Sequence, residues 1–266
     1  MFFSIACEVI GCFFNSKGKE ITFYGVNCFG LQRPPFIKQR LYYDNTIRAL
    51  ANTWNFNAVR LPIAWIAIEP KQGVFPGSSE YNEIFRKSGC PDDYIQRLDW
   101  IINYFGSLGV YVIPELHNRP IKRKNHETPY TELTRTKFKG LKPWIDVRDM
   151  KKRAPSILGW LARHWRGNSN IAAIEIPYNE PSPMENEQWL WATDETYYDF
   201  IQLCARAVKQ ADPSRLVVMD PPFWAHDNTL PSTTWRTPPE VDGIFPHYYH
   251  GRAIRFHNYI PKTVQA

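Results

Sequence analysis

Short apolar runs alternate with longer amphipathic stretches along most of this chain. A short run that is apolar throughout is typical of a strand in a parallel sheet that is covered on both faces. The amphipathic stretches between the runs are typical of helices, so the alternation predicts an α/β protein. Six strands are predicted, near residues 22–28, 58–63, 110–116, 171–178, 215–220 and 243–248.

The helix predicted after Pro91 shows the helical period most clearly. Its apolar residues recur at offsets that place them on one helix face, and Gly109 is a stop signal. Further helices are predicted near 43–55 and 147–166, and a fourth is predicted to end at Asp212-Pro213. The face residues are Tyr94, Leu98, Ile101, Ile102, Phe105 and Leu108 in the helix after Pro91, and Tyr197, Phe200, Ile201, Cys204 and Val208 in the last helix.

A hairpin is predicted at the start of the chain, over residues 5–28. The apolar CEVIGCFF is followed by NSKG at 15–18, whose residue types are those of a tight turn, and then by the alternating EITFYGVN. No glycine-rich phosphate-binding loop follows this first strand. The pattern therefore argues against a dinucleotide-binding sheet.

Polar residues with reactive groups lie at or near the end of almost every predicted strand. In a (β/α) barrel the carboxyl ends of all strands meet at one mouth, where the active site lies. The arrangement therefore predicts a TIM-type (β/α)8 barrel, of which residues 1–266 supply about six βα units in a single, C-terminally incomplete domain. The residues at the strand ends are Arg60, Glu115, His117, Asn179, Glu180, Asp220, His247 and Tyr249.

The composition fits a folded globular domain. Hydrophobic residues make up 44% of the 266 positions, aromatic residues 15%, and the mean hydropathy is −0.43. No apolar run reaches the roughly 18 residues of a membrane span, and no secretory signal is recognisable at the start. The five cysteines lack metal-site spacing. Most are expected to be small buried residues, with a bridge from Cys7 to Cys12 or Cys28 as the alternative.

Positive charge is concentrated in residues 119–153, which hold twelve Lys and Arg residues against four acidic ones. The whole chain carries +6, so the remainder is slightly acidic. No nucleic-acid-binding motif accompanies the basic segment, so a charged lid or solvated loop is expected there and no nucleic-acid partner. Neither His126 nor the pair His247 and His250 has zinc-site spacing, so no metal and no cofactor is predicted.

The segment IEIPYNEP carries the strongest chemical signal. Its apolar strand ends at Asn179 and Glu180, and Pro181 biases the residue before it toward an extended conformation. A carboxyl among apolar walls at a barrel mouth has a raised pKa, which suits a general acid at neutral pH. VRLPIAW and ELHN precede this segment and PHYY follows it. With these motifs the chain resembles glycoside hydrolase family 5, the cellulase-like retaining glycosidases, over roughly residues 8–250.

The resemblance implies roles for residues around a cleaved sugar. Glu180 matches the acid/base of the family, and Asn179 matches the amide that binds the sugar 2-hydroxyl. Arg60 matches the arginine that steadies the nucleophilic carboxylate. The remaining matches are His117, His247 and Tyr249 in the ring around the sugar, and Trp224 as either a sugar-stacking platform or an ordinary rim aromatic.

The resemblance also implies a nucleophilic Glu after a seventh strand, but no Asp or Glu follows Asp242. A retaining mechanism needs two carboxyl groups about 5–5.5 Å apart. Three interpretations stay open: a piece of an active glycosidase, a degenerate homologue that only binds sugar, and a barrel completed by a second chain, as in a homo-oligomer. Glu115 and Asp220 are possible substitutes near strand ends, but neither is favoured.

The expected activity is retaining hydrolysis of β-linked glycosides, foremost as an endo-β-1,4-glucanase. Its partner would be an oligosaccharide or polysaccharide, or the sugar of a glycolipid. A β-mannanase, an endoglycoceramidase-like hydrolase and a non-catalytic carbohydrate-binding protein are the alternatives. The resemblance implies a secreted enzyme, and the sequence leaves the compartment open.

Overall fold

A computed structural model describes the protein in segments. Expectations for the turn at 15–18, for residues 119–149 and for residues after 244 fall outside the described residues. The segments are residues 13–14, 20–28, 44–45, 47–88, 94–117, 150–176, 194–219 and 238–244.

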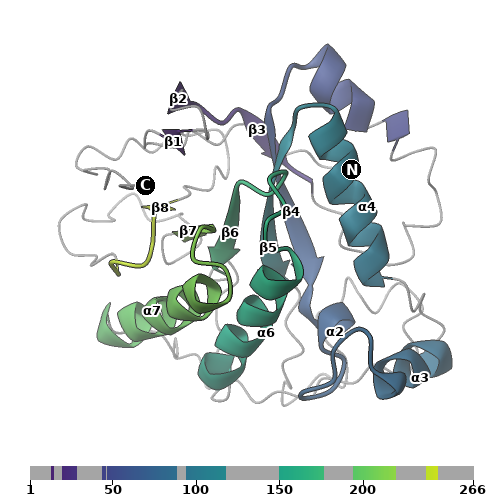
Figure 1. Cartoon of the computed structure of the whole chain (residues 1–266), viewed down its shortest axis with the longest axis vertical. Helices are drawn as coiled ribbons and strands as arrows, with labels where there is room; N and C mark the ends of the chain where they lie inside the picture. The colour runs from purple at the N-terminus through teal and green to yellow at the C-terminus, as the bar shows by residue number, and fades with distance from the viewer. Residues whose placement is uncertain are drawn as a thin grey trace, which may run out of the picture.

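The described residues contain a six-stranded parallel sheet (Figure 1). Its strands lie side by side in the same order as in the sequence, and each pairs in parallel with the next. A doubly wound sheet reverses its strand order at a switch point, whereas a (β/α) barrel keeps it, so the observed order is that of a barrel. The six predicted strands are confirmed. They are Gly25–Asn27 (β3), Ala58–Ala64 (β4), Tyr111–His117 (β5), Ala173–Ile176 (β6), Leu216–Met219 (β7) and Gly243–Ile244 (β8).

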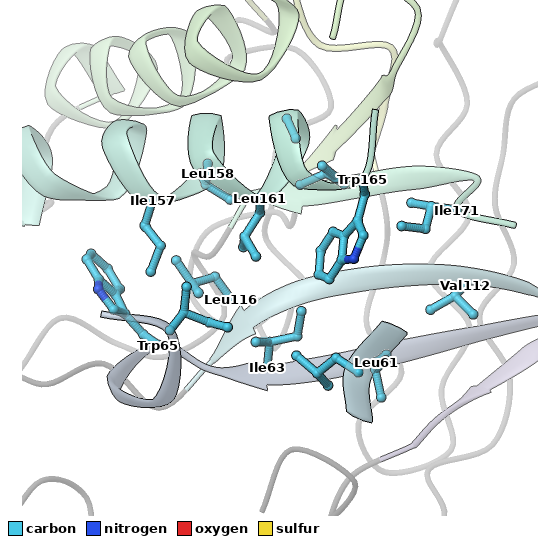
Figure 2. Packing of buried hydrophobic residues seen from close by; sticks show 14 of the residues in the cluster. Leu61, Ile63, Trp65, Val112, Leu116, Ile157, Leu158, Leu161, Trp165 and Ile171 are labelled. Atoms are coloured by element: carbon cyan, nitrogen blue, oxygen red, sulfur yellow. The ribbon is translucent and has the colours of Figure 1, made fainter. Parts of the chain in front are cut away.

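Successive residues of each strand lie on opposite faces of the sheet. On β4, Leu61 and Ile63 belong to the large apolar core beneath the helices. Figure 2 shows Ile63 and Leu116 of β4 and β5 facing Ile157 and Leu161 of α6 (Met150–His164). Full burial of such a side chain contributes roughly 1.5–3 kcal/mol, so the packing of this face against the helices stabilises the barrel wall. The opposite face carries a smaller cluster of Ile113, Ala173 and Val218.

The predicted helices are present, with one difference in form. Residues 44–53 are helical in their described part, and they end in a π-helical turn, Ala49–Thr53 (η2). On α4 (Tyr94–Ser107) every residue of the predicted face up to Phe105 is buried, and Gly109 follows with a φ of 74°. A positive φ is easy only for glycine, which explains why this helix stops there. The last helix, α7 (Asp194–Ala211), packs against α6.

Two helices follow β4 that the sequence pattern did not predict. These are α2 (Trp65–Ile68) and α3 (Ser79–Ser88). The Tyr81 and Phe85 rings of α3 stack with centroids 4.4 Å apart, and both side chains are fully buried. The Ser78 hydroxyl accepts a hydrogen bond from the Tyr81 backbone N–H at 3.2 Å, which caps the start of α3.

A buried ion pair ties the segment after β4 to α6. The Glu69 side chain is fully buried and forms an ion pair with Arg153. Its two oxygens also accept the Trp65 indole N–H at 3.1 Å and the Gly73 backbone N–H at 2.8 Å. Every oxygen of this carboxylate therefore has a donor, as a buried charge requires.

The predicted hairpin is also confirmed where it is described. Strand β1 (Phe13–Phe14) pairs antiparallel with β2 (Glu20–Ile21). None of the helices in the described segments is long and apolar enough to cross a membrane.

Candidate active site

Arg60 lies on the face of β4 that is turned away from the helices, and the residue is only 3% exposed. Its Nε donates to Glu175 Oε2 at 2.6 Å, and its Nη2 donates to Glu175 Oε1 at 2.7 Å. A second carboxylate oxygen, Glu115 Oε2, lies 3.4 Å from Nη2. We refer to Arg60, Glu115 and Glu175 as the interior charge cluster.

The strand register explains why these three side chains meet. Glu115 of β5 and Glu175 of β6 are direct partners across the two strands. Pro62 of β4 is the partner of Glu115, and Arg60 precedes it by two residues on the same face. Asn27 of β3 is in turn the partner of Arg60. Four neighbouring strands thus place a polar residue on the same face of the sheet.

The interior charge cluster is a preorganised electrostatic site. Two parallel N–H···O bonds to one carboxylate fix the plane of the guanidinium as well as its position. The side chains of all three members are 2% exposed or less, so water does not screen them. The two carboxylates offset the charge of the guanidinium, so the cluster provides a guanidinium of fixed position and orientation on the interior face of the sheet.

One predicted site residue lies in the described interior, and a second is described only by its backbone. Arg60 is in the interior charge cluster, and the backbone of His117 forms the last residue of β5, paired with Ala64 at the end of β4. The carboxyl ends of β4 and β5 therefore lie side by side at the same edge of the sheet. The predicted residues outside the described part are Asn179, Glu180, Trp224, His247 and Tyr249.

Sequence reasoning missed Glu175. It lies inside the apolar run IAAIEI, and a single acidic residue there does not interrupt the strand pattern. An acidic residue inside a strand that is otherwise apolar could have indicated it. A buried carboxylate is costly without a partner, so it predicts a cation from elsewhere in the fold. Glu115 was noted as a residue near a strand end, and the structure gives it an ion pair with Arg60.

The two described cysteines, Cys28 and Cys204, are buried, and Cys28 is a free thiol. Burial raises the pKa of the Cys28 thiol to about 12. The expectation of small buried cysteines is confirmed for Cys28 and Cys204, and the bridge from Cys7 to Cys28 is wrong. Within the described segments, no group of three or more His, Cys, Asp or Glu side chains could hold a metal ion.

Known proteins share the barrel architecture. The family model for cellulase, glycosyl hydrolase family 5, matches residues 14–265. A solved β-glucanase, SdGluc5_26A from Saccharophagus degradans, is similar with a TM-score of 0.56 and 22% identity, over 90% of this chain and 59% of that one. The exo-β-1,4-mannosidase Op5Man5 from Opitutaceae bacterium strain TAV5 is similar with a TM-score of 0.55 and 16% identity, over 79% of this chain and 34% of that one. No match was found among curated protein sequences.

These likenesses differ in what they establish. The chain spans about a third of the length of the mannosidase and about three fifths of that of the β-glucanase. At such low identity the two structures establish the fold, which is a TIM-type barrel. The family model covers nearly the whole sequence and includes the strand that carries Arg60. The chain therefore belongs to glycosyl hydrolase family 5.

Proposed function

We propose that the protein hydrolyses β-linked glycosides with retention of configuration. The observation that carries this proposal is the buried Arg60, held in a two-bonded fork on the interior face of a family 5 barrel. Burying an arginine together with two carboxylates carries a large desolvation penalty, which an arginine at the surface does not have. A guanidinium placed there suits a reaction in which a carboxylate acts beside it.

In this proposal Glu180 has two successive tasks. It first donates a proton to the leaving oxygen while a nucleophilic carboxylate attacks the anomeric carbon and forms a covalent glycosyl ester. It then removes a proton from water, which attacks the same carbon and releases the sugar and the nucleophile. Asn179 binds the 2-hydroxyl, and Arg60 steadies the nucleophile. His117, His247, Tyr249 and Trp224 complete the surroundings of the sugar.

The proposed substrate is a β-1,4-linked glucan. The name of the solved β-glucanase supports glucose, and the name of the solved mannosidase supports mannose as the second choice. The two sugars differ in the configuration at C2, which is the position that Asn179 is proposed to contact. The sugar of a glycolipid is a third choice.

A non-catalytic sugar-binding protein is the second candidate function. Binding requires hydrogen-bonding and aromatic groups, but it does not require a second carboxylate.

The stereochemistry of the first product tests the proposal. The natural protein, at the length its source produces, is incubated with cellopentaose and with mannopentaose, and the new reducing ends are followed by NMR. The proposal expects the β-anomer to form first from cellopentaose, and it expects the Glu180→Gln variant to form none. An α-anomer as the first product, or equal rates for the two proteins, would contradict it. Sugar binding without any product would establish the second candidate.

A further inference from the structure

We propose that Glu175 is a positioning residue for the glycosidase reaction, which acts through Arg60 and does not touch the sugar. This inference rests on the proposed function and assigns a role to a residue that the family resemblance left without one. It starts from the fact that Arg60 and Glu175 lie 115 positions apart in the chain and meet in a doubly hydrogen-bonded contact.

Glu175 rather than Glu115 determines the orientation of Arg60. Both oxygens of Glu175 accept hydrogen bonds, at 2.6 and 2.7 Å, from Nε and Nη2. Glu115 Oε2 lies farther away, 3.4 Å from Nη2, which is a nitrogen that Glu175 already engages. Two bonds fix a plane whereas one does not, so Glu175 sets the direction in which the guanidinium faces.

The position of Glu175 in the sheet gives it a second effect. It lies on β6, five residues before Glu180, while Arg60 lies on β4. The ion pair therefore joins β4 to β6 across β5. It fixes the position of β6, which leads to Glu180, along the strand direction relative to β4, which carries Arg60. A misplacement of about 1 Å in such a constellation can lower a rate by about a hundredfold.

A double-mutant cycle tests the inference. The natural protein is compared with Arg60→Met, Glu175→Gln and the double variant, and kcat and KM are measured for an aryl β-cellobioside. The matched control is Glu69→Gln, because Glu69 and Glu175 are both fully buried and both pair with an arginine. Glu69 lies after β4, outside the interior charge cluster. The fold of each variant is checked by near-ultraviolet circular dichroism.

We expect Glu175→Gln to lower kcat by about 10- to 100-fold with little change in KM, since misplacement affects the transition state more than binding. The double variant should be no slower than Arg60→Met alone, because Glu175 acts only through Arg60. Glu69→Gln should keep the natural kcat. If Arg60→Met does not fold, Arg60→Lys replaces it in the cycle. If Glu175→Gln does not fold, Glu175→Asp replaces it, and its shorter carboxylate should lower kcat only in the variant that keeps Arg60.

Different results overturn different claims. Additive losses in the double variant, an unchanged kcat in Glu175→Gln, or an equal kcat loss in Glu69→Gln would overturn the positioning role while the glycosidase itself stands. A natural protein that hydrolyses no β-glycoside would overturn the proposed function, and the positioning role with it.

Discussion

Among the individual residues, burial separates ion pairs that matter for stability from pairs that do not. The Arg60 and Glu175 side chains are 2% and 0% exposed, whereas those of Lys71 and Glu80 are 62% and 50% exposed, although both pairs have a contact of 2.6 Å. Water and salt screen the exposed pair but not the buried one. Equal distances therefore do not imply equal energies.

We predict that Arg60→Met destabilises the chain far more than Lys71→Met does. The first change leaves two carboxylates buried without their cation, which costs about 3–5 kcal/mol. The second removes an exposed pair, which costs at most about 1 kcal/mol. Urea unfolding followed by tryptophan fluorescence measures both free energies. Similar losses in the two variants would contradict the description of the interior charge cluster as buried.

Cys28 predicts a dependence of stability on pH. Burial raises its thiol pKa from 9.0 to about 12, so the folded protein binds the thiol proton more tightly than the unfolded chain does. The contribution of Cys28 to the free energy of unfolding is therefore fully present below about pH 9. It is lost at about 1.4 kcal/mol per pH unit as the pH rises toward 12.

The Cys28→Ala variant lacks this thiol and isolates its effect from all other titrations. We predict that the stability advantage of the natural chain over Cys28→Ala shrinks between about pH 9 and pH 11, measured by urea unfolding at each pH. A difference that stays constant over this range would show that the folded thiol titrates normally.

The residues that sequence reasoning found and missed follow one rule. Arg60 was predicted because it lies in VRLPIAW, a local motif, and its position on β4 is confirmed. Glu175 was missed because its significance depends on a partner 115 residues away. A local pattern indicates that a residue faces the interior of the fold, but only the strand order shows which residue it meets there.

Among the secondary-structure elements, those with long regular patterns were predictable. The strands and the helices α4, α6 and α7 were predicted because their apolar residues repeat over two or more turns or fill a whole strand. The ten-residue α3 was missed because only Tyr81 and Phe85, one turn apart, mark its buried face so plainly. Two such residues do not distinguish a helix from a loop that buries two aromatic rings.

The pairing of β3 with β4 depends on Gly25. A Cβ at this position would lie 2.7 Å from the Ala58 carbonyl carbon and closer still to its oxygen. These are backbone atoms of the neighbouring strand, so the clash is relieved only by moving one strand away from the other. Gly25 does not have a positive φ, so backbone conformation does not explain the glycine. The close approach of the two strands does.

We predict that Gly25→Ala destabilises the chain by about 1–3 kcal/mol, the usual cost of overpacking. Gly159→Ala is the matched control, because a Cβ there would lie 3.3 Å from the Ala207 carbonyl oxygen, a contact that a small shift relieves. We expect it to change stability by less than about 1 kcal/mol, since alanine also favours the helix. Urea unfolding of both variants decides the matter, and equal effects would refute the account of Gly25.

For the molecule as a whole, the strand order connects fold and function. Six strands in sequence order bring their carboxyl ends together, and the polar residues at those ends were the reason to predict a barrel. The family model confirms this architecture and the family. The roles of the strand-end residues, and one domain over the matched range, stay proposals.

The dependence of catalysis on the leaving group tests the central claim, that Glu180 is the general acid. The measurement is kcat/KM of the natural protein and of Glu180→Gln for phenyl and for 2,4-dinitrophenyl β-cellobioside. A phenyl leaving group needs a proton, whereas dinitrophenolate leaves without one. We predict that the substitution lowers kcat/KM about 10²- to 10⁴-fold for the phenyl substrate and by less than about tenfold for the dinitrophenyl substrate. An equal effect on both substrates, or no effect on either, would contradict the account.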